Sequence, residues 1–84
     1  SNYTSVIGRG FYKDNMAQSL TIEVPVQFFS KSEIIGFTQY LTGVLYSEFP
    51  NDLAIEVDIN SINGAEALIL KERDAKEPIV HIYN

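Results

Sequence analysis

The most constraining feature of this sequence is a stretch of fourteen residues, 34–47, that contains no charged side chain. Just before it, Ser30 and Glu33 have the S-x-x-E spacing typical of a helix capping box, with Ser32 as a competing cap. Pro50 follows the stretch, and the residue before a proline avoids helical dihedral angles. The sequence therefore predicts one long helix that begins at the Ser30 cap and ends before Pro50.

The two sides of this helix differ in character. At 100° per residue, one stripe is apolar and is expected to cover a sheet: Ile34, Phe37, Leu41, Val44, Leu45 and Phe49. The opposite side lacks the Lys, Glu or Arg that a water-facing helix normally carries: it holds Ile35, Gly36, Gln39, Tyr40, Gly43, Tyr46 and Ser47.

Two glycines make the uncharged side unusual. Gly36 and Gly43 each cost about 1 kcal/mol relative to alanine inside a helix, and a spacing of seven puts them on nearly the same side. There they allow another backbone to approach closely, beside the tyrosines that protein interfaces favour. We expect this surface to bind a partner, most simply a second copy in a homodimer. Two alternatives stay open: a solvated face with incidental glycines, or an N-terminal segment folded over the helix.

Before the helix, the clearest strand is residues 20–28, where apolar and polar side chains alternate. Pro25 lacks a backbone N–H, so this strand is expected at a sheet edge or with a bulge at that residue. A weaker strand at residues 3–12 precedes it. The turn residues 13–15 connect the two and predict a hairpin.

After the helix, Asn63-Gly64 is the strongest hairpin signal, because both residues tolerate positive φ. This signal and a charged turn separate three further predicted strands at residues 54–59, 66–72 and 79–83. The charged residues 71–77 are expected at a solvated hairpin tip. The whole chain, residues 1–84, is predicted to be a single α+β domain, with one helix on a mostly antiparallel sheet in the order ββαβββ.

Composition excludes several classes of function. The chain has no cysteine and one histidine, so we expect no metal site and no cofactor. A net charge of −5 argues against nucleic acid as a partner, because such binding depends on neutralising phosphates. No run of apolar residues is long enough to span a membrane. With no visible signal peptide, the sequence predicts a cytoplasmic protein.

Candidate chemical groups are few, and no catalytic residue is predicted. Glu56 and Asp58 share one face of a strand about 7 Å apart, and Glu23 joins them if its strand is adjacent. This acidic face is expected to meet a basic protein partner. An alternative is a small ligand-binding or enzymatic domain with a site on the sheet near His81.

A second alternative is a weak nucleic-acid binder that uses the segment from Arg9 to Lys13, where a basic residue and a glycine precede aromatic residues that could stack on bases. The sequence favours neither alternative. It predicts a small acidic, non-enzymatic protein–protein interaction module that self-associates through its uncharged helix face and binds or inhibits a basic partner.

Overall fold

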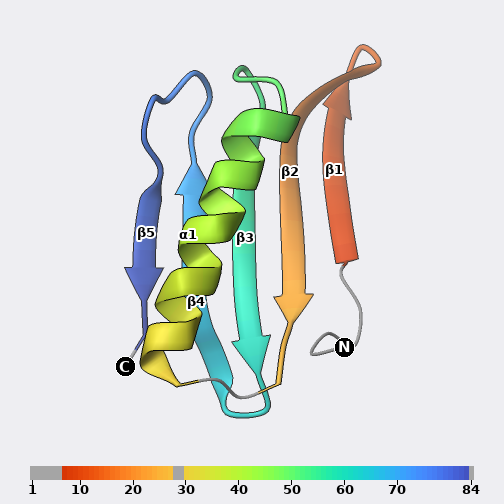
Figure 1. Cartoon of the computed structure of the whole chain (residues 1–84). Helices are drawn as coiled ribbons and strands as arrows, with labels where there is room; N and C mark the ends of the chain where they lie inside the picture. Colours follow the sequence, from red (N-terminus) through yellow and green to blue (C-terminus); the bar gives the residue numbers. More distant parts are fainter. Residues whose placement is uncertain (1–6, 28–29, 84) are drawn as a thin grey trace.

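The computed structural model describes residues 7–27 and 30–83 and confirms the predicted α+β fold with the order ββαβββ (Figure 1). Two strands precede the helix and three follow it. The elements are β1 (Ile7–Lys13), β2 (Met16–Pro25), α1 (Lys31–Glu48), β3 (Ala54–Ser61), β4 (Gly64–Lys71) and β5 (Ile79–Ile82).

The five strands form one sheet in the order β1-β2-β3-β4-β5. All neighbouring pairs are antiparallel except β2 and β3, which are parallel because α1 carries the chain back between them. The helix lies diagonally across one face of the sheet (Figure 1). We call the face turned away from α1 the open face, since no helix in the described part of the chain covers it.

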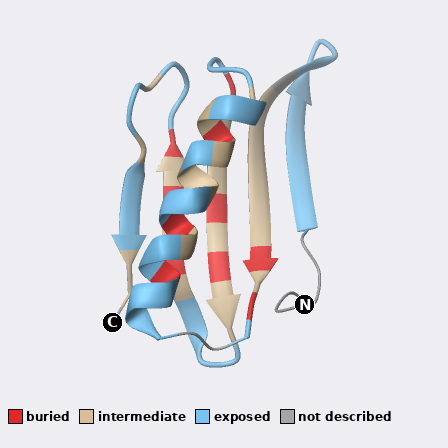
Figure 2. Ribbon diagram, in the orientation of Figure 1, coloured by how far each residue is buried: buried red, intermediate tan, exposed pale blue. Residues whose placement is uncertain are grey.

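The core lies between α1 and the central strands (Figure 2). Alternate residues of β3 and β4 point toward the helix, and the residues between them point to the open face. The buried hydrophobic side chains that α1, β3 and β4 contribute are Ile34, Leu45, Ile55, Val57, Ile59, Ala67 and Ile69.

Both predicted hairpins are confirmed, because each depends on local backbone chemistry. Asp14 and Asn15 join β1 to β2 with φ of 52° and 66°, the left-handed conformations that a two-residue hairpin turn requires. Gly64 begins β4 with φ of 106°, a conformation that favours glycine.

The predicted helix ends are confirmed as well. The Ser30 side chain accepts a hydrogen bond from the Glu33 backbone N–H, and the Glu33 carboxylate accepts one from the Ser30 N–H at 3.1 Å. This second bond lowers the pKa of Glu33 below its usual range. The helix ends at Glu48, two residues before Pro50.

The strand boundaries and the place of Pro25 differ from expectation. β2 begins at Met16, and it is not an edge strand, because it lies between β1 and β3. Pro25 pairs with Asn60 of β3, and the described pairing of β2 with β1 reaches Glu23. The register shifts instead near the other end of β2: Phe11 pairs with Ser19 and Tyr12 with Ala17, so Gln18 is the extra residue of β2. The predicted strand residues 3–6 and 28 fall outside the described ranges.

Candidate interaction surfaces

The outer face of α1 is exposed as the sequence predicted for most of its residues. Ile35 is 40% exposed and Tyr40 is 67% exposed. The small and polar residues of the same face are also exposed: Gly36, Gln39, Gly43 and Ser47. A Cβ atom built on Gly36 or on Gly43 meets no atom within 4 Å, so both glycines face open space. The alternative that an N-terminal segment covers this face concerns residues outside the described ranges.

Tyr46 is placed differently from the prediction. It is half-buried, it packs against the core, and its hydroxyl donates to the backbone carbonyl of Ala75 at 3.2 Å. It comes directly after the buried Leu45, on the flank of α1 that reaches the connection between β4 and β5. We therefore exclude Tyr46 from the outer face of α1.

The structure adds β5 to this surface. Ile35 and Gln39 line a hollow of about 240 Å³ together with Val80 and Ile82 of β5. Thr38, which also lines it, is buried and donates to the Ile34 carbonyl at 2.7 Å, so its hydroxyl needs no partner outside the helix. We name the outer face of α1 and this hollow the helix surface. The sequence did not predict Val80 and Ile82 as part of this surface, because their contact with α1 depends on the order of the strands in the sheet.

The acidic residues Glu23, Glu56 and Asp58 lie together on the open face. Glu23 and Asp58 are direct partners across β2 and β3, and Glu56 is two residues from Asp58. A side-chain hydrogen bond with Asp58, followed by burial and by repulsion from that carboxylate, raises the pKa of Glu56. Glu23 forms an ion pair with Arg9 at 2.7 Å. The predicted shared face is present, although one of its carboxylates is paired.

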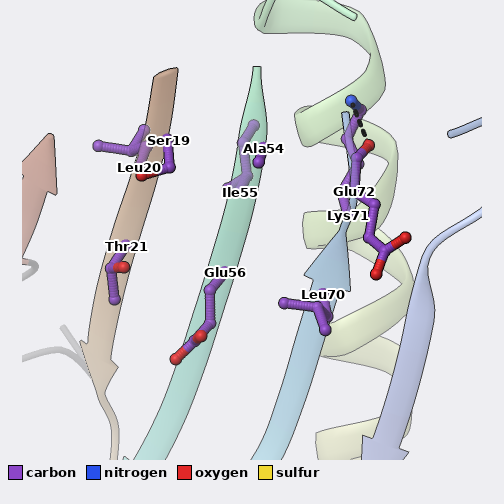
Figure 3. A pocket seen from close by; sticks show the side chains of 9 residues that line it. All are labelled: Ser19, Leu20, Thr21, Ala54, Ile55, Glu56, Leu70, Lys71 and Glu72. Atoms are coloured by element: carbon purple, nitrogen blue, oxygen red, sulfur yellow. Dashed lines mark hydrogen bonds between the residues drawn. The ribbon is translucent and has the colours of Figure 1, made fainter. Parts of the chain in front are cut away.

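A second hollow of about 230 Å³ lies on the open face beside Glu56 (Figure 3). Its floor is low because Ser19 and Ala54, which pair across β2 and β3, have small side chains. Thr21, Glu56 and Leu70 stand side by side on three neighbouring strands (Figure 3). The hollow thus combines hydroxyl, carboxylate and apolar groups.

The structure does not assemble the alternative site near His81. His81 pairs with Leu68, which in turn pairs with Asp58, so a leucine separates the imidazole from the carboxylates. The ring of His81 is exposed and meets the edge of the Tyr83 ring at 4.5 Å. The backbones of His81 and Asp58 are therefore two strand spacings apart, at about 4.8 Å for each spacing.

The segment from Arg9 to Lys13 does not form a stacking platform. Phe11 and Tyr12 are both exposed, but consecutive residues of a strand point to opposite faces. The Tyr12 ring lies over Gly10 on the helix side, within 2.7 Å of where a Cβ atom would stand. Arg9 is already bound to Glu23 on the open face.

Lys71 is the residue that sequence reasoning misplaced most. It was expected at a solvated tip, yet it ends β4 and is only 1% exposed. Its Nζ donates to the carbonyls of Asn51 at 2.8 Å, Leu53 at 3.2 Å and Glu72 at 3.4 Å, and it lies 5.6 Å from the centre of the Tyr46 ring. A charged residue after an alternating strand gave no signal of burial.

Neither a metal-binding cluster nor a membrane-spanning helix occurs in the described part of the chain. No group of three or more His, Cys, Asp or Glu side chains in residues 7–27 and 30–83 is placed to hold a metal ion. In the same ranges, no helix has both the length and the hydrophobicity needed to span a bilayer.

Three solved structures resemble this fold. The sex pheromone staph-cAM373 precursor has a TM-score of 0.89 at 24% identity, over 94% of this chain and 28% of that one, which supports the fold alone. The C-terminal domain of the sex pheromone staph-cAM373 precursor from Staphylococcus aureus has a TM-score of 0.77 at 38% identity, over 84% of this chain and 22% of that one. A sex pheromone precursor from Lactobacillus salivarius has a TM-score of 0.87 at 30% identity, over 95% of this chain and 24% of that one. This chain therefore spans about a quarter of each solved protein.

No curated protein matches the chain. The family model of the CamS sex pheromone cAM373 precursor matches residues 1–77. Sex pheromone precursors are secreted or lipoprotein-type proteins, so the predicted cytoplasmic location is wrong. That prediction rested on the absence of a visible signal peptide, which says nothing about a chain that covers only part of its relatives. Because the match covers nearly the whole sequence, the chain belongs to the CamS sex pheromone precursor family.

Proposed function

We propose that this chain is a non-enzymatic protein-binding domain of a sex pheromone precursor and that its helix surface binds a second copy of the chain. The family supports the non-enzymatic part, since its members are described as pheromone precursors. The geometry of the open face agrees, because the carboxylates and the imidazole are held apart.

The observation that carries the self-association is the exposed, uncharged outer face of α1. The fourteen residues 34–47 contain no charge, and Ile35 and Tyr40 expose apolar area there. The hollow beside β5 extends that area with Val80 and Ile82. Depletion of charge and enrichment of aromatic residues are the features that distinguish the centre of protein interfaces from other surfaces.

A two-fold pair of α1 helices suits this surface. Gly36 and Gly43 lie on either side of Tyr40 along the helix. At both glycines, the position that a Cβ atom would occupy has no neighbouring atom within 4 Å. Two helices that cross near residue 40 therefore approach closely at the glycines, while each Tyr40 ring packs against the other helix. A closed two-fold dimer buries both copies of the surface at once.

Light scattering over a concentration series tests this proposal. The wild-type mass should rise from 9.4 kDa toward twice that value. Tyr40→Glu should remain monomeric, because it places a charge in the proposed interface. Ile62→Glu is the matched control, since Ile62 is 93% exposed in the β3–β4 turn, and it should associate as the wild type does.

Two results contradict self-association through this surface. One is a wild-type mass that stays at the monomer value throughout the series. The other is an equal loss of association in Tyr40→Glu and Ile62→Glu. Circular dichroism of both variants establishes that each remains folded.

A further inference from the structure

The net charge of this protein is concentrated on one side of its sheet. Five carboxylates lie on the open face or line its hollow: Glu23, Glu56, Asp58, Glu66 and Glu72. Arg9 and Lys71 are the basic residues among them, since Lys71 also lines the hollow although its side chain is buried. Five against two leaves three of the five net negative charges there. On the rest of the molecule, six acidic residues meet four basic ones, which leaves the remaining two negative charges.

Apolar side chains flank this acidic strip on both sides. On β1, Ile7 and Phe11 pair with open-face residues of β2 and are exposed. On the other side, Leu70 pairs with Ile79, which is 58% exposed. An acidic strip between two apolar borders differs from an ordinary solvated sheet face, where charged residues of both signs are interspersed.

The hollow beside Glu56 gives this face a shape as well as a charge. The small pair Ser19 and Ala54 forms its floor, Leu70 forms an apolar wall, and the Glu56 carboxylate stands at its rim (Figure 3). A lysine or arginine side chain fits such a site, because its methylene stem packs on apolar groups while its charged head reaches a carboxylate. The neighbouring Asp58 strengthens the attraction, since a cation relieves the repulsion between the two carboxylates.

We infer that the open face binds a basic polypeptide segment of another protein, with a Lys or Arg side chain in the hollow beside Glu56 and apolar side chains over Leu70 and Ile79. Charge selects this occupant. An anionic membrane surface or a nucleic acid is repelled by the net negative charge of this face, and so is the open face of a second copy. This surface lies on the opposite side of the sheet from α1, so the inference is independent of self-association.

Fluorescence anisotropy with three labelled peptides tests the inference. The first alternates lysine with leucine, the second replaces each lysine with glutamate, and the third replaces each leucine with serine. The lysine–leucine peptide should bind most tightly, with an affinity that falls as salt is added. The glutamate peptide should not bind, and the lysine–serine peptide should bind more weakly than the first.

Charge-matched variants locate the site. Glu56→Gln with Asp58→Asn should weaken binding of the lysine–leucine peptide about tenfold or more. Glu48→Gln with Glu77→Gln removes the same charge from exposed positions elsewhere and should change the affinity less than about twofold. Ile79→Ser should weaken binding, whereas Ile62→Ser should not.

Equal losses from the two charge-matched pairs overturn the inference, because binding then follows net charge alone. Equal binding of the lysine and glutamate peptides also overturns it. Tyr40→Glu should bind the lysine–leucine peptide as the wild type does. A protein that stays monomeric but shows the predicted peptide binding refutes the proposed self-association and leaves this inference standing. A protein that dimerises but does not show the predicted peptide binding refutes this inference and leaves self-association standing.

Discussion

Lys71 shows how single residues connect distant parts of this small chain. Its side chain is buried, and it forms no salt bridge with any residue that the structure describes. Three backbone carbonyls accept its three protons, two of them from the loop between α1 and β3. Beside it, the Tyr46 hydroxyl donates to Ala75 in the connection between β4 and β5. Together the two side chains hold both loops against the end of the sheet.

Replacing Lys71 with methionine should therefore destabilise the fold. Met fills similar space but leaves the Leu53 carbonyl without its donor, so we expect a loss of about 1–3 kcal/mol in the free energy of unfolding by urea. Lys76→Met, at an exposed position in the following turn, is the control and should stay within about 0.5 kcal/mol. A Lys71→Met protein as stable as the wild type contradicts this role.

The raised pKa of Glu56 gives a prediction for pH dependence. A carboxyl group with a raised pKa in the folded state favours folding when protonated, and it loses this contribution as the pH rises through the raised pKa. Glu56→Gln should thus be more stable than the wild type at neutral pH, by about 0.5 kcal/mol or less, with the difference fading in acid. Thermal unfolding across pH measures it.

Asp58→Asn supplies the control for that experiment. It removes the same repulsion, so Glu56→Gln should bring no further gain in that background. A gain of equal size in both backgrounds contradicts the coupling between the two carboxylates.

At the scale of elements, the helix combines a well-defined start with an unusual interior. The capping box fixes its first turn, while two glycines weaken its middle without any close neighbour in the described structure. Such glycines lower the stability of an isolated domain. Their presence is consistent with a surface that gains contacts only when another chain packs against it.

Gly43→Ala should accordingly stabilise the folded monomer by about 0.5–1 kcal/mol, because the new Cβ atom meets no atom and the unfolded chain loses freedom. Gly64→Ala should do the opposite, since φ of 106° is strained for alanine. Urea unfolding at low protein concentration measures both. A loss of stability in Gly43→Ala would show that this face of α1 is packed within the monomer.

The parts that sequence could predict were those set by neighbouring residues. The capping box of Ser30 and Glu33, the turn before Gly64 and the shared face of Glu56 and Asp58 each depend on a few consecutive positions. The parallel pairing of β2 with β3, the burial of Lys71 and the inward position of Tyr46 depend on residues far apart in the chain. No local pattern encodes those contacts, so they emerged only with the strand order.

For the whole molecule, the two proposed surfaces lie on opposite sides of one sheet. The helix surface is uncharged, and the open face carries most of the net charge. A two-layer domain of this kind can bind a second copy on one side and a basic segment on the other without competition. The chain spans about a quarter of its solved relatives, so both surfaces belong to a larger protein in those relatives.

Backbone amide NMR shifts, followed as the protein concentration rises, test the helix surface most directly. The account predicts concentration-dependent shifts and line broadening at Ile35, Gly36, Gln39, Tyr40 and Gly43, with unchanged signals at Glu56 and Asp58. Spectra that do not change with concentration, or changes confined to the open face, would contradict it.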